Sequence, residues 1–324
     1  MAIATATYLA HSAIGLREDL SDIIYEISPT ETPFMTNASR ESAKAIYCEW
    51  QTDSLAAAST ANAQLEGDDI TGQSAAPTVR AANRLQISRK SITISGTLDA
   101  VDKAGRARET SYQISKQGRE LKRDMESILL SSNVATAGSD VSARAMAGIE
   151  SWLATNFTVD ATNTTHVTQS AFKSGGAPVS AITDGTATVI DETIFKSVIA
   201  DIWTAGGDPR MIMCGAFNKQ KISGFSGIAT NFKNVPQGQA TIVGAADLYV
   251  SDFGEHQIVP NRFSRAGTVL FLDMDYWAVA YLRPIHQIEL AKTGDAEKRA
   301  LLVEYTLISR NQESSGKLPG LTTS

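Results

Sequence analysis

The sequence has little cysteine and no cysteine motif. Cys48 and Cys214 lie far apart and outside any C-x-x-C pattern, which excludes a disulfide framework and a cysteine-based zinc site. No H-E-x-x-H motif is present, and the four histidines are scattered without metal-ligand spacing: His11, His166, His256 and His286. We therefore expect no metal and no cofactor.

Long apolar runs and a basic charge balance are also missing. No window approaches the ~20 apolar residues that span a bilayer, so no membrane partner is expected. The N-terminal residues MAIATATYLAHS lack the basic region and apolar core of a signal peptide, which favours synthesis and use in the cytoplasm or in an assembly formed there. A net charge of -6 and a pI near 5.3 exclude the basic footprint of a dedicated nucleic-acid binder.

Motifs for nucleotide binding and nucleophilic catalysis are absent as well. Neither G-x-x-x-x-G-K-[ST], G-x-G-x-x-G nor G-x-S-x-G occurs. The S-x-x-K match at Ser170 lies in a Thr- and Ser-rich stretch without supporting motifs, so we treat it as chance. The acids Glu66, Asp68 and Asp69 would suit a cation, but solvated acids at a loop tip are commoner. The sequence thus predicts no active site.

The chain contains enough apolar residues for a large core, and its sequence predicts one long helix. With 324 residues, 43% of them hydrophobic, it can form one elaborated domain or two. Thr110 to Ser131 predicts an amphipathic helix of roughly 30 Å without proline. Its apolar stripe consists of Ile114, Gly118, Leu121, Met125, Ile128 and Leu129. Its opposite, polar face consists of Lys116, Arg119, Glu120, Arg123 and Glu126.

The N-terminal region predicts an arm. After small and polar residues comes a short amphipathic stretch, Leu16 to Ile27, and then ISPTETPF, Ile27 to Phe34. Because a proline disfavours the helical region for the residue before it, the two prolines predict an extended path through Ser28 and Thr32. We expect residues 1–44 to lie on another surface.

Two alternating stretches follow, Ala45 to Trp50 and Arg84 to Thr97, and both predict strands. Ile46, Cys48 and Trp50 would share one face of the first. Leu55 to Ala82 lies between them, with no aromatic residue, cysteine or lysine, so it cannot form a core. Loops this long are uncommon inside compact domains. We predict an antiparallel pair that carries a projecting loop; a surface loop without a role is the alternative.

The C-terminal half is predicted to mix helices and strands. Residues 154–190 predict loops and short strands. Asp191 is a predicted N-cap for the helix Glu192 to Ala205, whose apolar face runs from Ile194 to Trp203. Beyond the strand Met211 to Cys214 and a helix from Ala216 to Phe225, four strands are predicted: Asp247 to Asp252, His256 to Pro260, Thr268 to Asp273 and Trp277 to Leu282. This order is α+β.

A hairpin and a tail end the chain. The predicted strands are Gln287 to Lys292 and Arg299 to Arg310, with a turn from Thr293 to Lys298 that contains Gly294 and Asp295. One face of the second strand would cover the stripe of the long helix, through Leu301, Val303, Tyr305 and Leu307. We expect the tail NQESSGKLPGLTTS to be polar and extended.

The sequence resembles the major capsid (major head) proteins of tailed bacteriophages with the Hong Kong 97-like fold. The matching phrases run in register along nearly the whole chain: SPTETPF at 28–34, EWQTDSL at 49–55, LEGDD at 65–69, NRLQIS at 83–88, ISGT at 94–97, GRELKRDME at 118–126 and AKTGDAEKRALLVEYTL at 291–307.

The resemblance implies an architecture with five parts. Residues 1–44 would be the N-terminal arm, and 45–97 an extended loop that overlaps a neighbouring subunit. Residues 98–190 would be a peripheral domain that holds the spine helix, 110–131, and a variable insertion, 154–190. Residues 191–283 would be an axial domain that meets its copies around capsomer centres, and 284–324 would return to the peripheral domain and form the C-terminal tail.

The implied function is structural. The chain would self-assemble through hexamers and pentamers into an icosahedral head that encloses double-stranded DNA without sequence-specific contact. The portal and scaffolding or decoration proteins would be further partners. It would be assembled in the bacterial host cytoplasm and end in the virion. Two alternatives stay open at this point: a tail or decoration protein, and a hydrolase that uses the acids at 66–69 or Ser170.

Contacts between subunits are the expected site. The resemblance places the turn residues Thr293, Gly294, Asp295 and Lys298 near the three-fold axes. At the loop tip, Glu66, Asp68 and Asp69 repel one another unless cations meet them. We therefore expect this tip to dock on the basic face of an adjacent subunit, which consists of Arg106, Arg108, Lys116, Arg119, Lys122 and Arg123.

Overall fold

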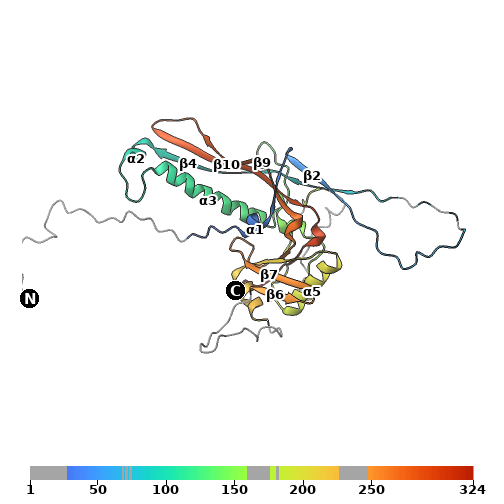
Figure 1. Ribbon diagram of the computed structural model, residues 1–324. Helices are drawn as coiled ribbons and strands as arrows, with labels where there is room; N and C mark the ends of the chain where they lie inside the picture. The colour runs from blue at the N-terminus through green and yellow to red at the C-terminus, as the bar shows by residue number, and fades with distance from the viewer. Residues whose placement is uncertain are drawn as a thin grey trace, which may run out of the picture.

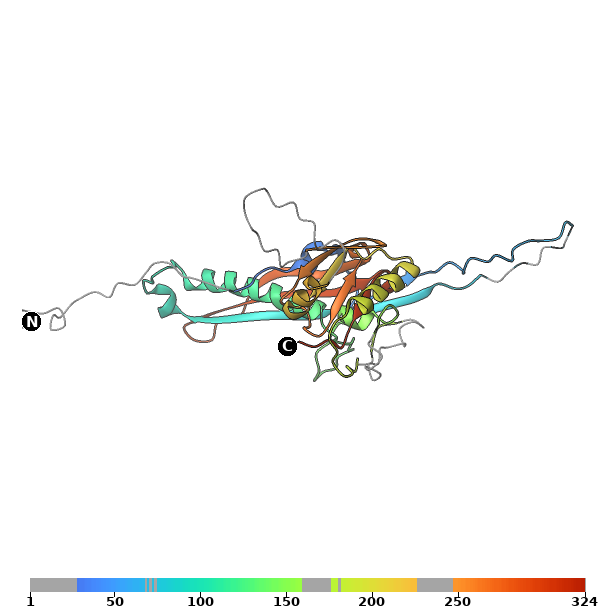
Figure 2. The ribbon, with the colours of Figure 1, turned by 90° about the horizontal axis from the view of Figure 1, so that it is seen from below.

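The computed structural model describes residues 28–67, 69, 72, 75–158, 176–179, 182–225 and 247–323. The molecule is a flat, elongated body from which one long loop projects at one end (Figures 1 and 2). The body contains two larger sheets. One core lies within the five-stranded sheet's half, and the other packs residues of both sheets together, including Met213 and Leu270 of the five-stranded sheet. The amphipathic stretch expected at 16–27 lies outside the described residues.

A four-stranded sheet forms the long half of the body. Its strand order is β1 (Ser39–Ser42), β9 (Trp277–Glu289), β10 (Ala296–Ser309) and β4 (Gln86–Ser95). β10 pairs antiparallel with both β9 and β4, whereas β1 runs parallel to β9. The predicted C-terminal hairpin is confirmed, although its first strand begins earlier, because the strand expected at Trp277 continues into it without a break.

The long helix α3, Glu109–Leu129, confirms the predicted helix and lies along one face of this sheet (Figure 1). Leu121, Met125 and Leu129 are buried as expected, in a core that includes Val303 and Tyr305 of β10. The same core takes in α4, Ile149–Trp152, beyond the end of α3. The prediction for Glu126 was wrong: it is fully buried instead of facing solvent.

A five-stranded sheet forms the other half. Its order is β11 (Gly316–Leu318), β8 (Val269–Leu272), β5 (Met211–Cys214), β7 (Gly254–Pro260) and β6 (Leu248–Ser251). Helix α5, Glu192–Thr204, packs Phe195 and Ile199 into its core, and helix α6 spans Ala216–Ser223. Asp191 caps α5 as predicted, because its side chain accepts a hydrogen bond from the Thr193 amide. Trp203 was wrongly placed on the buried face, since it is 58% exposed.

The strand pair that carries the projecting loop differs from the prediction. β2 (Tyr47–Thr52) pairs antiparallel with β3 (Val79–Arg84), while the stretch expected as its partner forms β4 in the four-stranded sheet. Ala81 and Ala82 of β3 are buried, so the end of the supposed loop does contribute to a core. Ile46 precedes β2 and is 51% exposed, which corrects its place on the strand's inner face.

The expected extended arm contains a short helix. α1 runs over Pro33–Asn37 and begins with a proline, whose missing N–H is not needed in the first turn and whose fixed φ suits a helix start. Phe34 is fully buried in the same core as α3. The arm is therefore anchored on its own chain at this point.

The polar tail is not a free extended segment. It forms a short 3-10 helix, Gln312–Ser314, and then β11, which pairs antiparallel with β8. Ser315, Gly316 and Lys317 are buried. The domain boundary expected at residue 283 falls inside β9. The tail adds β11 to the five-stranded sheet and not to the sheet that contains β9 and β10.

Candidate assembly surfaces

The projecting loop has no core of its own. Residues 53–78 connect β2 to β3, whose register closes with Thr52 opposite Val79. Every described residue of this loop is exposed, including two leucines, Leu55 at 99% and Leu65 at 80%. Exposed apolar side chains become more stable when another surface covers them and removes them from water. The described part of the loop therefore leaves both leucines uncovered on its own chain.

Two of the three acids expected at the loop tip lie in the described part of the chain. Glu66 and Asp69 are exposed, and Asp68 lies outside the described residues. The loop projects from the opposite end of the body to α2, Gly96–Ala100, and the β9–β10 turn (Figures 1 and 2). Helix α3 runs along the body between these ends, so within one chain the loop extends away from it.

Several residues of the expected basic face already have contacts within their own chain. Arg106 contacts Glu109 and lies over the Tyr112 ring, and Arg108 lies 3.8 Å from an Asp99 oxygen. Arg123 stacks over the ring of Phe263, with its guanidinium carbon 5.5 Å from the ring centre.

The remaining basic residues of α3 differ in exposure: Lys116 and Arg119 are half-buried, and Lys122 is exposed. Lys122 is thus the best-placed cation for a neighbouring acid.

The start of α3 is capped from another helix. Arg108, its N-cap residue, makes no side-chain cap, but the Asp99 carboxylate accepts from the amides of Glu109 (3.0 Å) and Thr110 (3.3 Å). The Thr110 bond, the nearby Arg108 and the other donors lower the pKa of Asp99 below its usual value. α2 and α3 are therefore fixed together at the end of the body away from the loop.

The β9–β10 turn lies at this same end. Gly294 has a φ of +76°, a left-handed conformation that favours glycine. Lys298 donates a hydrogen bond to Thr293 across the turn, and the Asp295 carbonyl accepts from the Gly96 amide at 3.1 Å. The four turn residues expected at a contact are thus brought together, next to α2.

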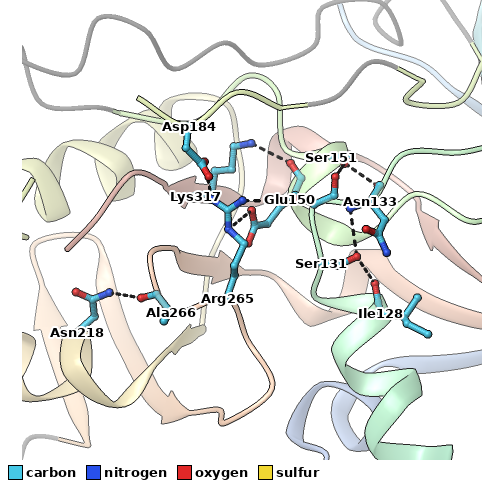
Figure 3. Close-up of polar contacts among 11 residues, drawn as sticks. Ile128, Ser131, Asn133, Glu150, Ser151, Asp184, Asn218, Arg265, Ala266 and Lys317 are labelled. Atoms are coloured by element: carbon cyan, nitrogen blue, oxygen red, sulfur yellow. Dashed lines mark hydrogen bonds and ion pairs between the residues drawn. The ribbon is translucent and has the colours of Figure 1, made fainter. Parts of the chain in front are cut away.

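A buried polar cluster, which sequence reasoning missed, joins the two halves (Figure 3). Arg265 lies 3.4 Å from a Glu150 oxygen and 2.5 Å from Asp184. Lys317 donates to the backbone carbonyl of Glu150 at 2.9 Å. Glu150 and Lys317 are at most 1% exposed. Burial is the main cause that raises the pKa of Glu150 and lowers that of Lys317 to about 8.

The described residues offer no arrangement typical of catalysis. They contain no group of three or more His, Cys, Asp and Glu able to hold a metal ion. His256 is buried between Ser251 and the Pro209 carbonyl, and His286 contacts the Pro284 carbonyl. Among helices in the described parts of the chain, none is both long and apolar enough to cross a bilayer. Ser170 lies outside the part that the structure describes.

Comparison with known proteins agrees with this architecture. The chain is similar to the capsid of a native GTA particle, with a TM-score of 0.64, 10% identity and coverage of 97% and 98% of the two chains. It is also similar to the capsid of cyanophage A-1(L), with a TM-score of 0.63, 14% identity and coverage of 95% and 97%. The long helix, the projecting loop and the two sheets thus form the Hong Kong 97-like capsid fold.

The sequence comparisons identify the family. The model of the SU10 major capsid protein family matches residues 3–322. The major capsid protein of Escherichia phage Phieco32 is 28% identical over 349 aligned positions, which cover 96% of each chain. The chain belongs to the SU10 major capsid protein family. It is a phage major capsid protein, a part of the virion that forms the icosahedral shell.

Proposed function

We propose that copies of this chain form hexamers and pentamers in which each projecting loop covers a neighbouring subunit, and that the closed shell encloses double-stranded DNA. The observation that carries the proposal is the loop itself. Its described residues are all exposed, and its two leucines find no cover on the same chain. A second copy is the surface that a capsid protein meets most often.

The two halves take the roles of the two domains of this fold in the proposal. The half with α3 and the four-stranded sheet is the peripheral domain, and the half with the five-stranded sheet is the axial domain, which meets its copies around the capsomer centre. The β9–β10 turn, which contains Thr293, Gly294 and Asp295 and is followed by Lys298 in β10, lies near the three-fold axes. It is already rigid, because Asp295 is tied to Gly96, so it can present a fixed surface to two other copies.

Electrostatics specifies the docking in this proposal. The acidic tip of the loop, with Glu66 and Asp69 exposed, meets the basic side of α3 on the adjacent subunit, chiefly Lys122 and Lys116. Exposed pairs contribute at most ~1 kcal/mol each, so the contact depends on many copies. The portal, and scaffolding or decoration proteins, are further partners, and the DNA is held without sequence-specific contact.

The proposed role includes no catalysis. A hydrolase would need polar groups that converge in a pocket. One depression, between β1 and β2, is lined by carboxylates that already have partners: Glu41 lies 2.5 Å from Arg310, and Glu49 lies 3.5 Å from Arg80. A tail or decoration protein is disfavoured by the family match over almost the whole chain.

Electron microscopy of the chain expressed alone tests the proposal. We expect closed shells, or rings of five and six subunits. A stable monomer at all concentrations, or turnover of a hydrolysable substrate by that monomer, would contradict it.

A further inference from the structure

Glu126 of α3 connects three separate parts of the chain. Its side chain is fully buried, and one carboxylate oxygen accepts from the Phe34 amide and the Asn261 side-chain amide, both at 2.8 Å. The other oxygen accepts from the Met35 amide at 2.9 Å. Thr32, the N-cap residue of α1, provides no side-chain cap. Glu126 therefore satisfies the first amides of α1 from outside that helix.

Asn261 carries the contact into the five-stranded half. Its backbone amide donates to the Cys214 carbonyl at the end of β5, at 2.9 Å. Its side-chain oxygen accepts from the Phe263 amide at 2.8 Å. Glu126 is thus one of the groups that hold the start of the segment after β7, together with the Cys214 carbonyl.

The same segment leads to the buried polar cluster. Four residues after Asn261, Arg265 reaches Glu150, Asp184 and, at 3.4 Å, the hydroxyl of Ser132 just beyond α3 (Figure 3). Glu150 in turn accepts from Lys317 of β11 through its backbone carbonyl. Polar contacts at Asn261 and at Arg265, joined by the short backbone segment between them, therefore link the arm helix to the C-terminal strand across the junction between the halves.

We propose that docking of α1 and fixation of the five-stranded half against α3 are energetically coupled through Glu126 and Asn261. When α1 leaves, Glu126 keeps one of its three donors, and a buried carboxylate with unfilled acceptor sites is costly. The carboxylate then turns toward water and Asn261 loses its acceptor. The segment 261–265 becomes more mobile. The contact of Arg265 with Glu150 then weakens, and the contact of Glu150 with Lys317 weakens as a result. An arm displaced by a neighbouring subunit would in this way change the junction inside its own subunit.

Hydrogen exchange with mass spectrometry on the full-length, unassembled chain tests this coupling. Glu126→Gln keeps the shape but directs an amide NH₂ at groups that are themselves donors. We expect exchange to rise at least threefold in peptides that cover 34–38, and also in those that cover 261–267 and 316–318. Phe34→Ala displaces α1 without any change of charge, and the same remote peptides should respond. Glu41→Gln removes an exposed ion pair on β1 and serves as the control, with effects confined to its own surroundings.

A double-mutant cycle decides between coupling and independent damage. If Glu126→Gln and Asn261→Ala act through one contact, the double variant should exchange at 316–318 no faster than the more affected single variant. Exchange changes that stay within 34–38, or single effects that multiply in the double variant, would overturn the proposal. A Glu126→Gln chain that unfolds as a whole would expose all peptides equally, and Phe34→Ala would then decide alone.

Discussion

Lys317 donates its hydrogen bond to the backbone carbonyl of Glu150, 167 positions earlier in the chain, at a distance of 2.9 Å. The contact closes the end of the chain onto the start of α4, at the junction of the two halves. Neither side chain is solvated, so each depends on groups supplied by distant segments. The tail is therefore a structural element of the subunit, and shortening it should affect the fold before it affects assembly.

The first prediction concerns this contact. Lys317→Ala should lower the free energy of unfolding by about 2–3 kcal/mol, because it removes a buried hydrogen bond and leaves a cavity where the aliphatic stem packed. The melting temperature of the unassembled subunit should fall by roughly 4 to 10 °C. Lys298→Ala, near the start of β10, is the matched control and should stay within about 0.5 kcal/mol. Equal melting temperatures for both variants would show that the buried contact contributes nothing.

The second prediction concerns the length of the projecting loop. Replacing residues 56–75 with two glycines removes residues that are exposed wherever the structure describes them, and should leave a folded subunit that forms no shells. Removing 56–82 also takes the first four residues of β3, including the buried Ala81 and Ala82, so that chain should lose its cooperative melting transition. Far-UV circular dichroism and thermal melting distinguish the two. Shells from the shorter deletion would refute a role for the loop in assembly.

The third prediction tests the electrostatic docking. Changing Glu66, Asp68 and Asp69 together to Lys should abolish assembly, whereas any single reversal should be tolerated. The rescue should come from Lys116→Glu with Lys122→Glu, because Arg106 and Arg108 have acidic partners and Arg123 stacks on an aromatic ring.

Light scattering across a salt series measures this assembly. The wild type should assemble less well as salt shortens the Debye length from roughly 8 Å. Normal assembly of the triple variant at every salt concentration would leave backbone pairing and shape as the source of the docking.

The fourth prediction is the absence of covalent cross-links between subunits. An isopeptide bond from the projecting loop requires a lysine there, and residues 55–82 contain none. Mature particles boiled in detergent should therefore run as a single monomer band on a gel. A ladder of multimers would contradict this expectation and would indicate a donor elsewhere in the chain.

The fifth prediction is a pH dependence from Asp99. Its pKa in the folded chain is lowered from 3.8, chiefly by the hydrogen bond from the Thr110 amide. A lowered folded pKa stabilises the fold above the unfolded pKa, and this stabilisation is lost as the pH falls through the folded value. The melting temperature of Asp99→Ala should thus lie below that of the wild type at pH 6, and the gap should narrow as the pH falls below about 3.8. A gap that stays constant down to pH 2 would exclude the charge as its cause.

The sequence alone determined the parts of the fold whose causes are local. The spacing of Leu121, Met125 and Leu129 predicted α3, because an apolar stripe at helical period can be buried in one way. Asp191 predicted the start of α5 by the same local logic, since a cap bonds amides two or three residues away. The exposed loop followed from composition, because a stretch with so few large apolar residues cannot form a core.

Tertiary structure decided what depends on distant partners. Helical periodicity placed Glu126 on the solvent side of α3, yet α1 and Asn261 arrive there with three donors and bury it. The alternating residues of β4 predicted a hairpin partner for β2. A strand can pair with any free strand edge in the fold, however, and β4 pairs with β10. Lys317 lies in a stretch that the sequence predicts as a polar tail. It is buried where the Glu150 carbonyl accepts its hydrogen bond and the Glu150 carboxylate favours its charge. The periodicity of a sequence shows which face of a helix or strand is apolar. It does not show which polar side chains will find hydrogen-bond partners in distant parts of the chain.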